Sequence, residues 1–168
     1  MKRRTLAVAT ALVLMTSTLG LSACSKELVA QSGSDAQSTA NLDLERISSV
    51  LDDVGSAMAS ADASQNAADL GDKVTNGALE TRTAQYALAT ATGQAPLTLD
   101  FTPASLAITN SDSWPRAIFN ISASTKTALP VVQVYVQDSA RSDYKLTNFA
   151  RLLGGTQLTL PPVGTGSA

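Results

Sequence analysis

Residues 41–61, NLDLERISSVLDDVGSAMASA, decide how this chain folds. Apolar side chains recur in this stretch at spacings of three and four, which places them on one face of a helix. They are Leu44, Ile47, Leu51, Val54, Met58 and Ala61. A coiled-coil seam is the alternative, but the stripe is shorter than the heptad run that such a seam needs, so we expect the helix to lie on a sheet. Asn41 is the expected N-cap, and Asp43 and Glu45 suit the first turn.

A second helical region is expected over residues 66–91, after a break at residues 62–65. Asn76 and Gly77 are predicted to interrupt or kink it, because glycine is costly inside a helix. Leu79, Arg82, Tyr86 and Ala89 recur with helical spacing after this point. Gly93 is a suitable stop for the helix.

The second half of the chain has the composition of a β-sheet. Its four β-rich runs are SLAIT (105–109), RAIFNISA (116–123), VVQVYVQ (131–137) and YKLTNF (144–149). The connections between them are too short for crossover helices, so an antiparallel meander is expected. Alternation in the third run puts Val132, Val134 and Val136 on one face, with Gln133 and Tyr135 on the other. We expect the helices to cover the apolar face and to leave the mixed face open.

Helices followed by an antiparallel sheet define an α+β domain, which we expect over residues 42–163. The order of elements resembles the cone-shaped domains of the nuclear transport factor type, in which a curved sheet encloses a pocket. That resemblance implies a shape and no chemistry. Residues 164–168 are expected to form a disordered tail or the start of a linker.

The first residues have the pattern of an export signal. Lys2, Arg3 and Arg4 form a basic cluster, and an apolar stretch follows over residues 6–21. The stretch falls short of the roughly 20 apolar residues that a membrane span requires, which argues against the alternative of a single-pass anchor. The paired arginines also raise the twin-arginine route, although the strongly apolar stretch favours the general export route.

Leu21-Ser22-Ala23-Cys24 resembles the lipobox of bacterial lipoproteins. By that resemblance residues 1–23 are a signal peptide, and the sulfur of Cys24 takes a diacylglyceryl group. Two or more acyl chains, at about 0.8 kcal/mol per buried methylene, hold a protein stably on a bilayer. The resemblance therefore implies a lipid anchor on the extracytoplasmic face of the cell membrane. Residues 24–41, rich in Ser, Gln, Ala and Gly, are expected to be a flexible tether.

A wider resemblance covers most of residues 42–163. The spacing from LDDV (51–54) through SWPRAIF (113–119) and ARSDYKL (140–146) to LLGG (152–155) is similar to that in uncharacterised lipoproteins of high-GC Gram-positive bacteria. This family supports a surface location and supplies no catalytic residue.

Composition narrows the possible chemistry. The chain has no histidine, which removes the commonest general base and the preferred zinc ligand. Cys24 is the single cysteine, so a lipidated chain has no thiol nucleophile and no internal disulfide. The formal charge of −2 becomes more negative when the basic signal is removed, which argues against nucleic acid as a partner. We expect no cofactor and no metal.

Carboxylates are the remaining candidates for catalysis. Asp52 and Asp53 are neighbours on the expected helix and point about 100° apart, so they cannot form a facing pair and are expected on a solvated face. Asp112, Asp138 and Asp143 lie in turns without the spacing of a calcium loop. We expect no catalytic residue. A small envelope enzyme that uses carboxylates in a pocket, or an accessory domain of a larger envelope assembly, is the alternative.

Recognition is the function that the residue types favour. Trp, Tyr and Arg dominate binding surfaces because they combine a large contact area with directed donors. The candidates are Trp114, Arg116, Tyr135, Arg141 and Tyr144, with Lys145 beside them. Trp114 has the alternative role of closing one end of the core, and Arg141 and Lys145 that of solubilising charges. The expected partner is an envelope protein, a cell-wall component or a small ligand.

Overall fold

The computed structural model describes residues 40–123, 129–156 and 158–167. The predicted signal peptide, Cys24 and the first part of the predicted tether lie outside these residues. The helices are α1 (Leu44–Ser64) and α2 (Asn76–Thr92), with the short 3-10 helices η1 (Ala67–Leu70) and η2 (Val163–Thr165). The strands are β1 (Pro103–Ile108), β2 (Arg116–Ser122), β3 (Val131–Gln137) and β4 (Lys145–Arg151). They form one antiparallel sheet in the order β1-β2-β3-β4, so the predicted α+β class is confirmed.

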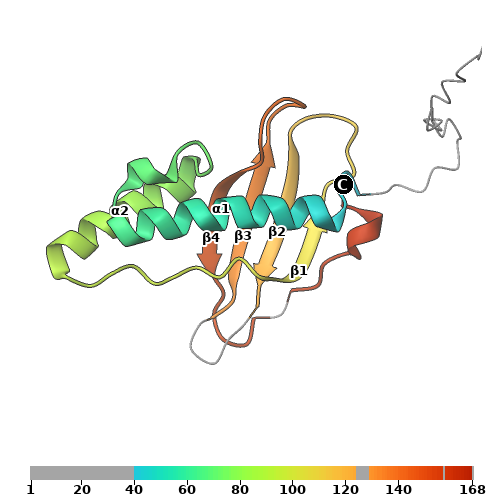
Figure 1. Ribbon diagram of the computed structural model, residues 1–168. Helices are drawn as coiled ribbons and strands as arrows, with labels where there is room; N and C mark the ends of the chain where they lie inside the picture. Colours follow the sequence, from blue (N-terminus) through green and yellow to red (C-terminus); the bar gives the residue numbers. More distant parts are fainter. Residues whose placement is uncertain (1–39, 124–128, 157, 168) are drawn as a thin grey trace, which may run out of the picture. The chain divides into compact units, whose positions relative to one another are not determined.

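Helix α1 carries the predicted apolar stripe on its buried face. Ile47, Leu51, Val54, Met58 and Ala61 are all buried. Figure 1 shows the helix lying across one face of the sheet, as the sequence predicts. The stripe is therefore the surface that joins the helical layer to the strands.

The ends of α1 differ from the prediction. Asp43, not Asn41, is the N-cap, and its side chain accepts a hydrogen bond of 2.8 Å from the backbone N–H of Arg46. Asn41 instead donates from its side chain to the carbonyl of Ser111 at 2.9 Å, so it is held by the connection between β1 and β2. The helix continues to Ser64, and Gln65, the last residue of the predicted break, caps it in a left-handed conformation.

The second helical region is divided rather than kinked. Its first part is only the turn η1, and α2 begins at Asn76. Between them the backbone bonds to the sheet, because Thr75 donates to the carbonyl of Leu146 and Leu146 donates to that of Lys73, both at 2.9 Å. Gly77 allows the start of α2 to approach β4, since an added Cβ would lie 2.7 Å from Oδ1 of Asn148.

The helices cover the mixed face of the sheet, so the predicted assignment of faces is wrong. Gln133 and Tyr135 of β3 are fully buried, whereas Val132, Val134 and Val136 are only partly buried on the opposite face. The register places Tyr135 beside Ile118 and Leu146, two of the most deeply buried apolar residues.

A hydrogen-bond network explains why a polar residue such as Gln133 lies in the core. Its Oε1 accepts bonds of 2.8 Å from Asn120 Nδ2 and from the Tyr135 hydroxyl. Its Nε2 donates to the carbonyl of Asp100 at 2.8 Å. Buried polar groups are tolerated where they are paired, so the network lowers the cost of placing the mixed face inwards, although Oδ1 of Asn120 has no partner among the described residues.

The two ends of the described domain meet beside β1. Ser167 donates to the carbonyl of Ile108 at 2.6 Å and accepts from the N–H of Asn110 at 3.0 Å. Asn41 donates to the carbonyl of Thr109 at 3.2 Å, so the end of the predicted tether belongs to the domain. In the predicted tail, the backbone of Ser167 is therefore bonded beside β1, after the short helix η2.

Candidate functional site

A cavity of about 460 Å³ opens where the start of α1 meets one end of the sheet. Its wall includes Asp43, Arg46 and Asp53 from α1 and its cap, and Lys73 from the turn before α2. The sheet side is formed by Trp114, Arg116, Gln137, Ser142, Asp143 and Tyr144. Small-molecule sites in proteins have volumes of about 300–1,000 Å³, so the cavity is large enough for a ligand.

The antiparallel register brings three of the predicted recognition residues to this cavity. Arg116 at the start of β2 pairs with Gln137 at the end of β3, and Val136 pairs with Lys145 at the start of β4. Strand starts and ends therefore meet at one end of the sheet. Trp114 and Tyr144 lie just before β2 and β4, and both line the cavity together with Arg116.

The other predicted recognition residues lie elsewhere. Tyr135 belongs to the buried network of the core and is 0 % exposed, so it cannot form part of a surface. Arg141 is exposed in the turn between β3 and β4, next to the cavity but not on its wall. Lys145 lines a different hollow with Thr75 and Asn148.

Arg116 stacks on Trp114 and has no other partner among the described residues. The guanidinium carbon lies 4.2 Å from the centre of the Trp114 ring system. The Arg116 side chain forms no ion pair or hydrogen bond within the part of the chain that the structure describes, and its Nε is buried without an acceptor. Nε is the one guanidinium nitrogen of Arg116 that is buried without a partner, so the two Nη groups are accessible to a ligand.

Tyr144 provides a second polar atom without a partner. The residue is 6 % exposed, and its hydroxyl is buried with no hydrogen bond. Burial raises the pKa of Tyr144, and the nearby charge of Arg116 partly opposes the shift. The group is therefore a neutral hydroxyl near pH 7, able to donate to an acceptor.

The acidic part of the cavity is organised around Lys73. Its Nζ lies 3.2 Å from Oδ2 of Asp143 and 3.6 Å from Oδ2 of Asp53. The hydrogen bond to Asp143 is the main cause that raises the pKa of Lys73. Asp53 is solvated as predicted, with 66 % of its side chain exposed, but it also faces this cavity.

Sequence reasoning gave no role to Lys73, and no local pattern would have identified it. The bond to Asp143 joins residues 70 positions apart. Asp143 itself had been considered only as a turn residue. The pair can be recognised only when the turn before α2 and the turn before β4 are seen side by side.

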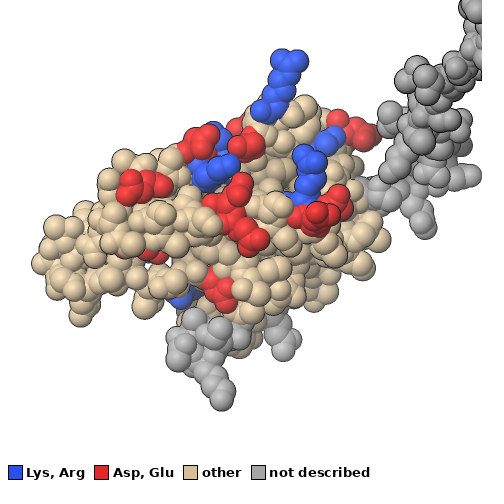
Figure 2. All heavy atoms as spheres, viewed as in Figure 1, with Lys and Arg blue, Asp and Glu red and all other residues tan. Residues whose placement is uncertain are grey.

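Charges of both signs are balanced around the cavity. The basic residues on its wall are Arg46, Lys73 and Arg116, and the acidic residues are Asp43, Asp53 and Asp143. Figure 2 shows the same mixture on the face that carries α1, where acidic and basic side chains are interspersed. A ligand with a large charge of one sign does not match such a surface.

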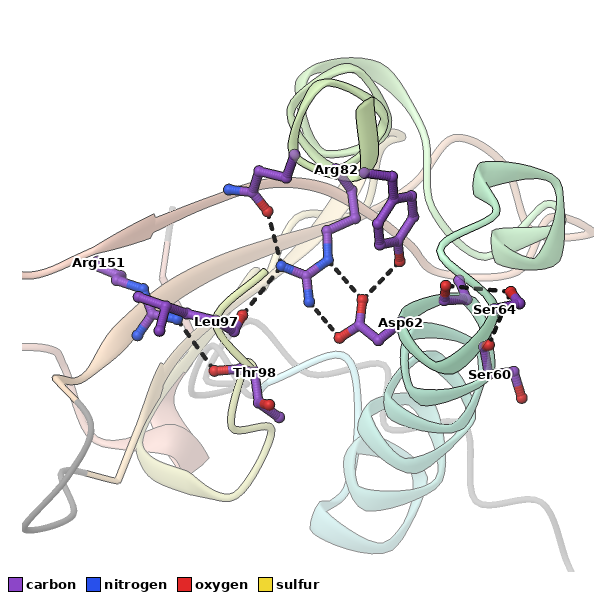
Figure 3. Close-up of polar contacts among 10 residues, drawn as sticks. Ser60, Asp62, Ser64, Arg82, Leu97, Thr98 and Arg151 are labelled. Carbon is purple, nitrogen blue, oxygen red and sulfur yellow. Dashed lines mark hydrogen bonds and ion pairs between the residues drawn. The ribbon is translucent and has the colours of Figure 1, made fainter. Parts of the chain in front are cut away.

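A second polar cluster surrounds Arg82 of α2 (Figure 3). Its guanidinium is 1 % exposed and forms a two-pronged ion pair with Asp62, near the end of α1. It also donates to Oε1 of Gln85 at 2.8 Å and to the carbonyl of Leu97 at 3.2 Å. The Tyr86 hydroxyl completes the cluster with a bond of 2.6 Å to Asp62. Because Arg82 is fully paired within the protein, this cluster is a structural clamp.

The described residues contain neither a candidate metal site nor a membrane-spanning helix. Within the described residues, no group of three or more Asp, Glu, Cys or His side chains is arranged to hold a metal ion. None of the helices in that part of the chain is long and apolar enough to cross a membrane. Comparison of the chain with protein-family models, with curated proteins and with solved structures finds no match. The likeness to the nuclear transport factor shape therefore stays a prediction.

Proposed function

We propose that this chain is a lipoprotein anchored on the extracytoplasmic face of the cell membrane, and that its α+β domain is a non-catalytic binding module. The lipobox-like residues Leu21-Ser22-Ala23-Cys24 support the anchor, as does the preceding basic and apolar signal pattern. In this proposal Cys24 is acylated, and the polar residues that follow it carry the domain off the bilayer.

One observation carries the binding role. Trp114, Arg116 and Tyr144 were selected by residue type alone, and all three line the same cavity. Buried polar groups in folded proteins are nearly always partnered. Two such groups without a partner, Nε of Arg116 and the Tyr144 hydroxyl, belong to residues of this wall. Their convergence supports a site that receives a ligand.

The carboxylates of the cavity favour binding over the alternative of a small envelope enzyme. A general acid or base usually has a pKa tuned by burial or by a specific neighbour. Asp53 and Asp143 have 66 % and 67 % of their side chains exposed. Both also lie within 4 Å of the ammonium of Lys73. Neither therefore has the buried setting in which a catalytic acid or base is usually found.

The anchor is tested by metabolic labelling with a fatty-acid analogue. Wild-type protein should incorporate the label and sediment with membranes. Cys24→Ser should lose both properties, whereas Ser25→Ala, the matched neighbouring change, should keep them. Equal labelling of wild type and Cys24→Ser would refute the anchor.

The binding role is tested by thermal unfolding in a deproteinised small-molecule extract of the cell envelope. A ligand that binds only the folded state raises the Tm. The extract should raise the Tm of the wild type and should not raise that of a folded Trp114→Ala/Tyr144→Ala variant. An equal rise in both proteins would exclude this cavity as the binding site.

A further inference from the structure

The charged groups of the cavity lie on different elements. Arg116 is in β2, and its guanidinium forms no ion pair among the described residues. Across β3, beside β4, the ammonium of Lys73 is shared by the carboxylates of Asp53 and Asp143. Arg116 thus marks a positive end of the cavity, and the Lys73 cluster marks an acidic end with one carboxylate in excess. The wall also carries Asp43 and Arg46, so its basic and acidic residues are equal in number.

The positive end has the geometry to bind a planar oxyanion. A guanidinium offers parallel N–H donors in one plane, which match the two oxygens of a carboxylate. Stacking on Trp114 at 4.2 Å restricts the orientation of that plane. The hydroxyl of Tyr144 is buried, so the donors that the cavity offers here are the Nη groups of Arg116.

The charge balance selects between kinds of anion. The three basic residues of the wall are matched by three carboxylates, so the cavity has no excess of positive charge to offset a phosphate or pyrophosphate. A carboxylate has one charge and suits the arginine alone. An ammonium group on the same ligand would be attracted to the acidic end.

We propose that the cavity binds a small zwitterion, with its carboxylate at Arg116 and its ammonium at Asp53 and Asp143. The chemistry is that of a free amino acid or a short peptide. The inference rests on the proposed binding function and names the ligand class of the same site. The cavity volume of about 460 Å³ is sufficient for a free amino acid or a short peptide.

The experiment uses the full chain, purified in detergent, and follows tryptophan fluorescence. Trp114 is the single tryptophan of the chain, so any change in emission arises at the cavity. The probes are alanine, the dipeptide alanyl-alanine, alaninamide, N-acetylalanine and inorganic phosphate. Alaninamide lacks the carboxylate and N-acetylalanine lacks the ammonium, so the two separate the charged ends. Comparison of alanine with alanyl-alanine distinguishes a free amino acid from a short peptide as the ligand.

Alanine or alanyl-alanine should change the emission and reach saturation. Alaninamide, N-acetylalanine and phosphate should each bind at least tenfold more weakly. Calorimetry on variants gives a readout independent of fluorescence. Arg116→Gln should weaken zwitterion binding at least tenfold, and Asp143→Asn should reduce the preference for alanine over N-acetylalanine. Arg141→Gln, which removes an exposed arginine outside the wall, should bind as the wild type does.

Several results would overturn the inference. N-acetylalanine binding as tightly as alanine would show that the acidic end does not contribute. Phosphate binding more tightly than the zwitterions would assign the site to another anion. If no probe binds while the envelope extract still raises the Tm of the wild type, the zwitterion is excluded and the binding function stands. If the extract also fails to raise the Tm of the wild type, both the zwitterion proposal and the proposed binding function are wrong.

Discussion

Two arginines of this protein, Arg82 and Arg116, have opposite environments. Arg82 is 1 % exposed and donates to Asp62, Gln85 and the carbonyl of Leu97. The Arg116 side chain stacks on Trp114 and forms no hydrogen bond or ion pair with a described residue. The first arginine uses its donors to hold α1, α2 and the following segment together. The second keeps its donors available beside a cavity.

This contrast separates a structural residue from a binding candidate by its partners. A buried charge is costly unless it is paired and hydrogen-bonded, and Arg82 meets that condition within the chain. Arg116 is less buried, so water or a ligand can accept hydrogen bonds from its guanidinium. The two sites should therefore respond very differently when a single polar group is removed.

The largest effect is expected at the Arg82 clamp. Asp62→Asn keeps the size of the side chain but leaves the Arg82 charge buried without a counterion. Removing one member of a buried ion pair costs about 3–5 kcal/mol, and Asp62 should fall near the lower bound because 20 % of its side chain is exposed. Chemical denaturation at pH 7 measures the loss.

A matched pair of variants sharpens this test. The double variant Asp62→Leu/Arg82→Met removes both charges and should be less destabilised than Asp62→Asn, because no unpaired charge remains. Arg116→Gln should change the free energy of unfolding by less than about 1 kcal/mol, since it removes the stacking on Trp114 but no ion pair with a described residue. If Arg116→Gln destabilised the protein as much as Asp62→Asn, the two arginines would have the same role.

The sequence predicted the elements better than the contacts between them. The run at residues 131–137 coincides with β3, and the apolar stripe of α1 is buried as expected. The face assignment failed because the partners of Gln133 come from other segments, Asn120 at 13 residues and Asp100 at 33. Alternation along a strand cannot reveal such partners, so a paired glutamine was taken for an outward-facing one.

The cavity was predictable only in part, for the same reason. Residue type identified Trp114, Arg116 and Tyr144, because aromatic and arginine side chains are common at binding sites. It could not show that Tyr135, of the same type as Tyr144, lies in the core. Nor could it show Lys73 beside Asp143, since no local pattern links residues so far apart.

A smaller effect is expected from the Arg82 clamp at high pH. Burial, with the hydrogen bond to Asp62 as the second cause, raises the pKa of Tyr86 from 10.0 to about 12. The folded state therefore holds the phenol proton more tightly than the unfolded state does. The stability from this group is fully present below pH 10 and is lost as the pH rises from 10 towards 12.

Tyr86→Phe removes that dependence. Urea denaturation at pH 9 and pH 11 should show a larger loss of stability for the wild type than for the variant. Tyr135 and Tyr144 also have raised pKa values, but both remain in the variant, so their contributions cancel in the comparison. Equal losses in the two proteins would mean that the Tyr86 proton is not held by the fold.

The smallest effect is expected at the cavity, from Tyr144→Phe. The hydroxyl of Tyr144 has no partner in the protein, so its removal costs no intramolecular hydrogen bond. Deleting an unsatisfied buried polar group is nearly neutral or stabilising, and we expect a change of less than about 0.5 kcal/mol. Tyr135→Phe is the matched control, because its hydroxyl donates to Gln133 at 2.8 Å and its loss should cost about 1 kcal/mol or more. If Tyr144→Phe were as costly as Tyr135→Phe, the Tyr144 hydroxyl would be bonded within the protein in solution.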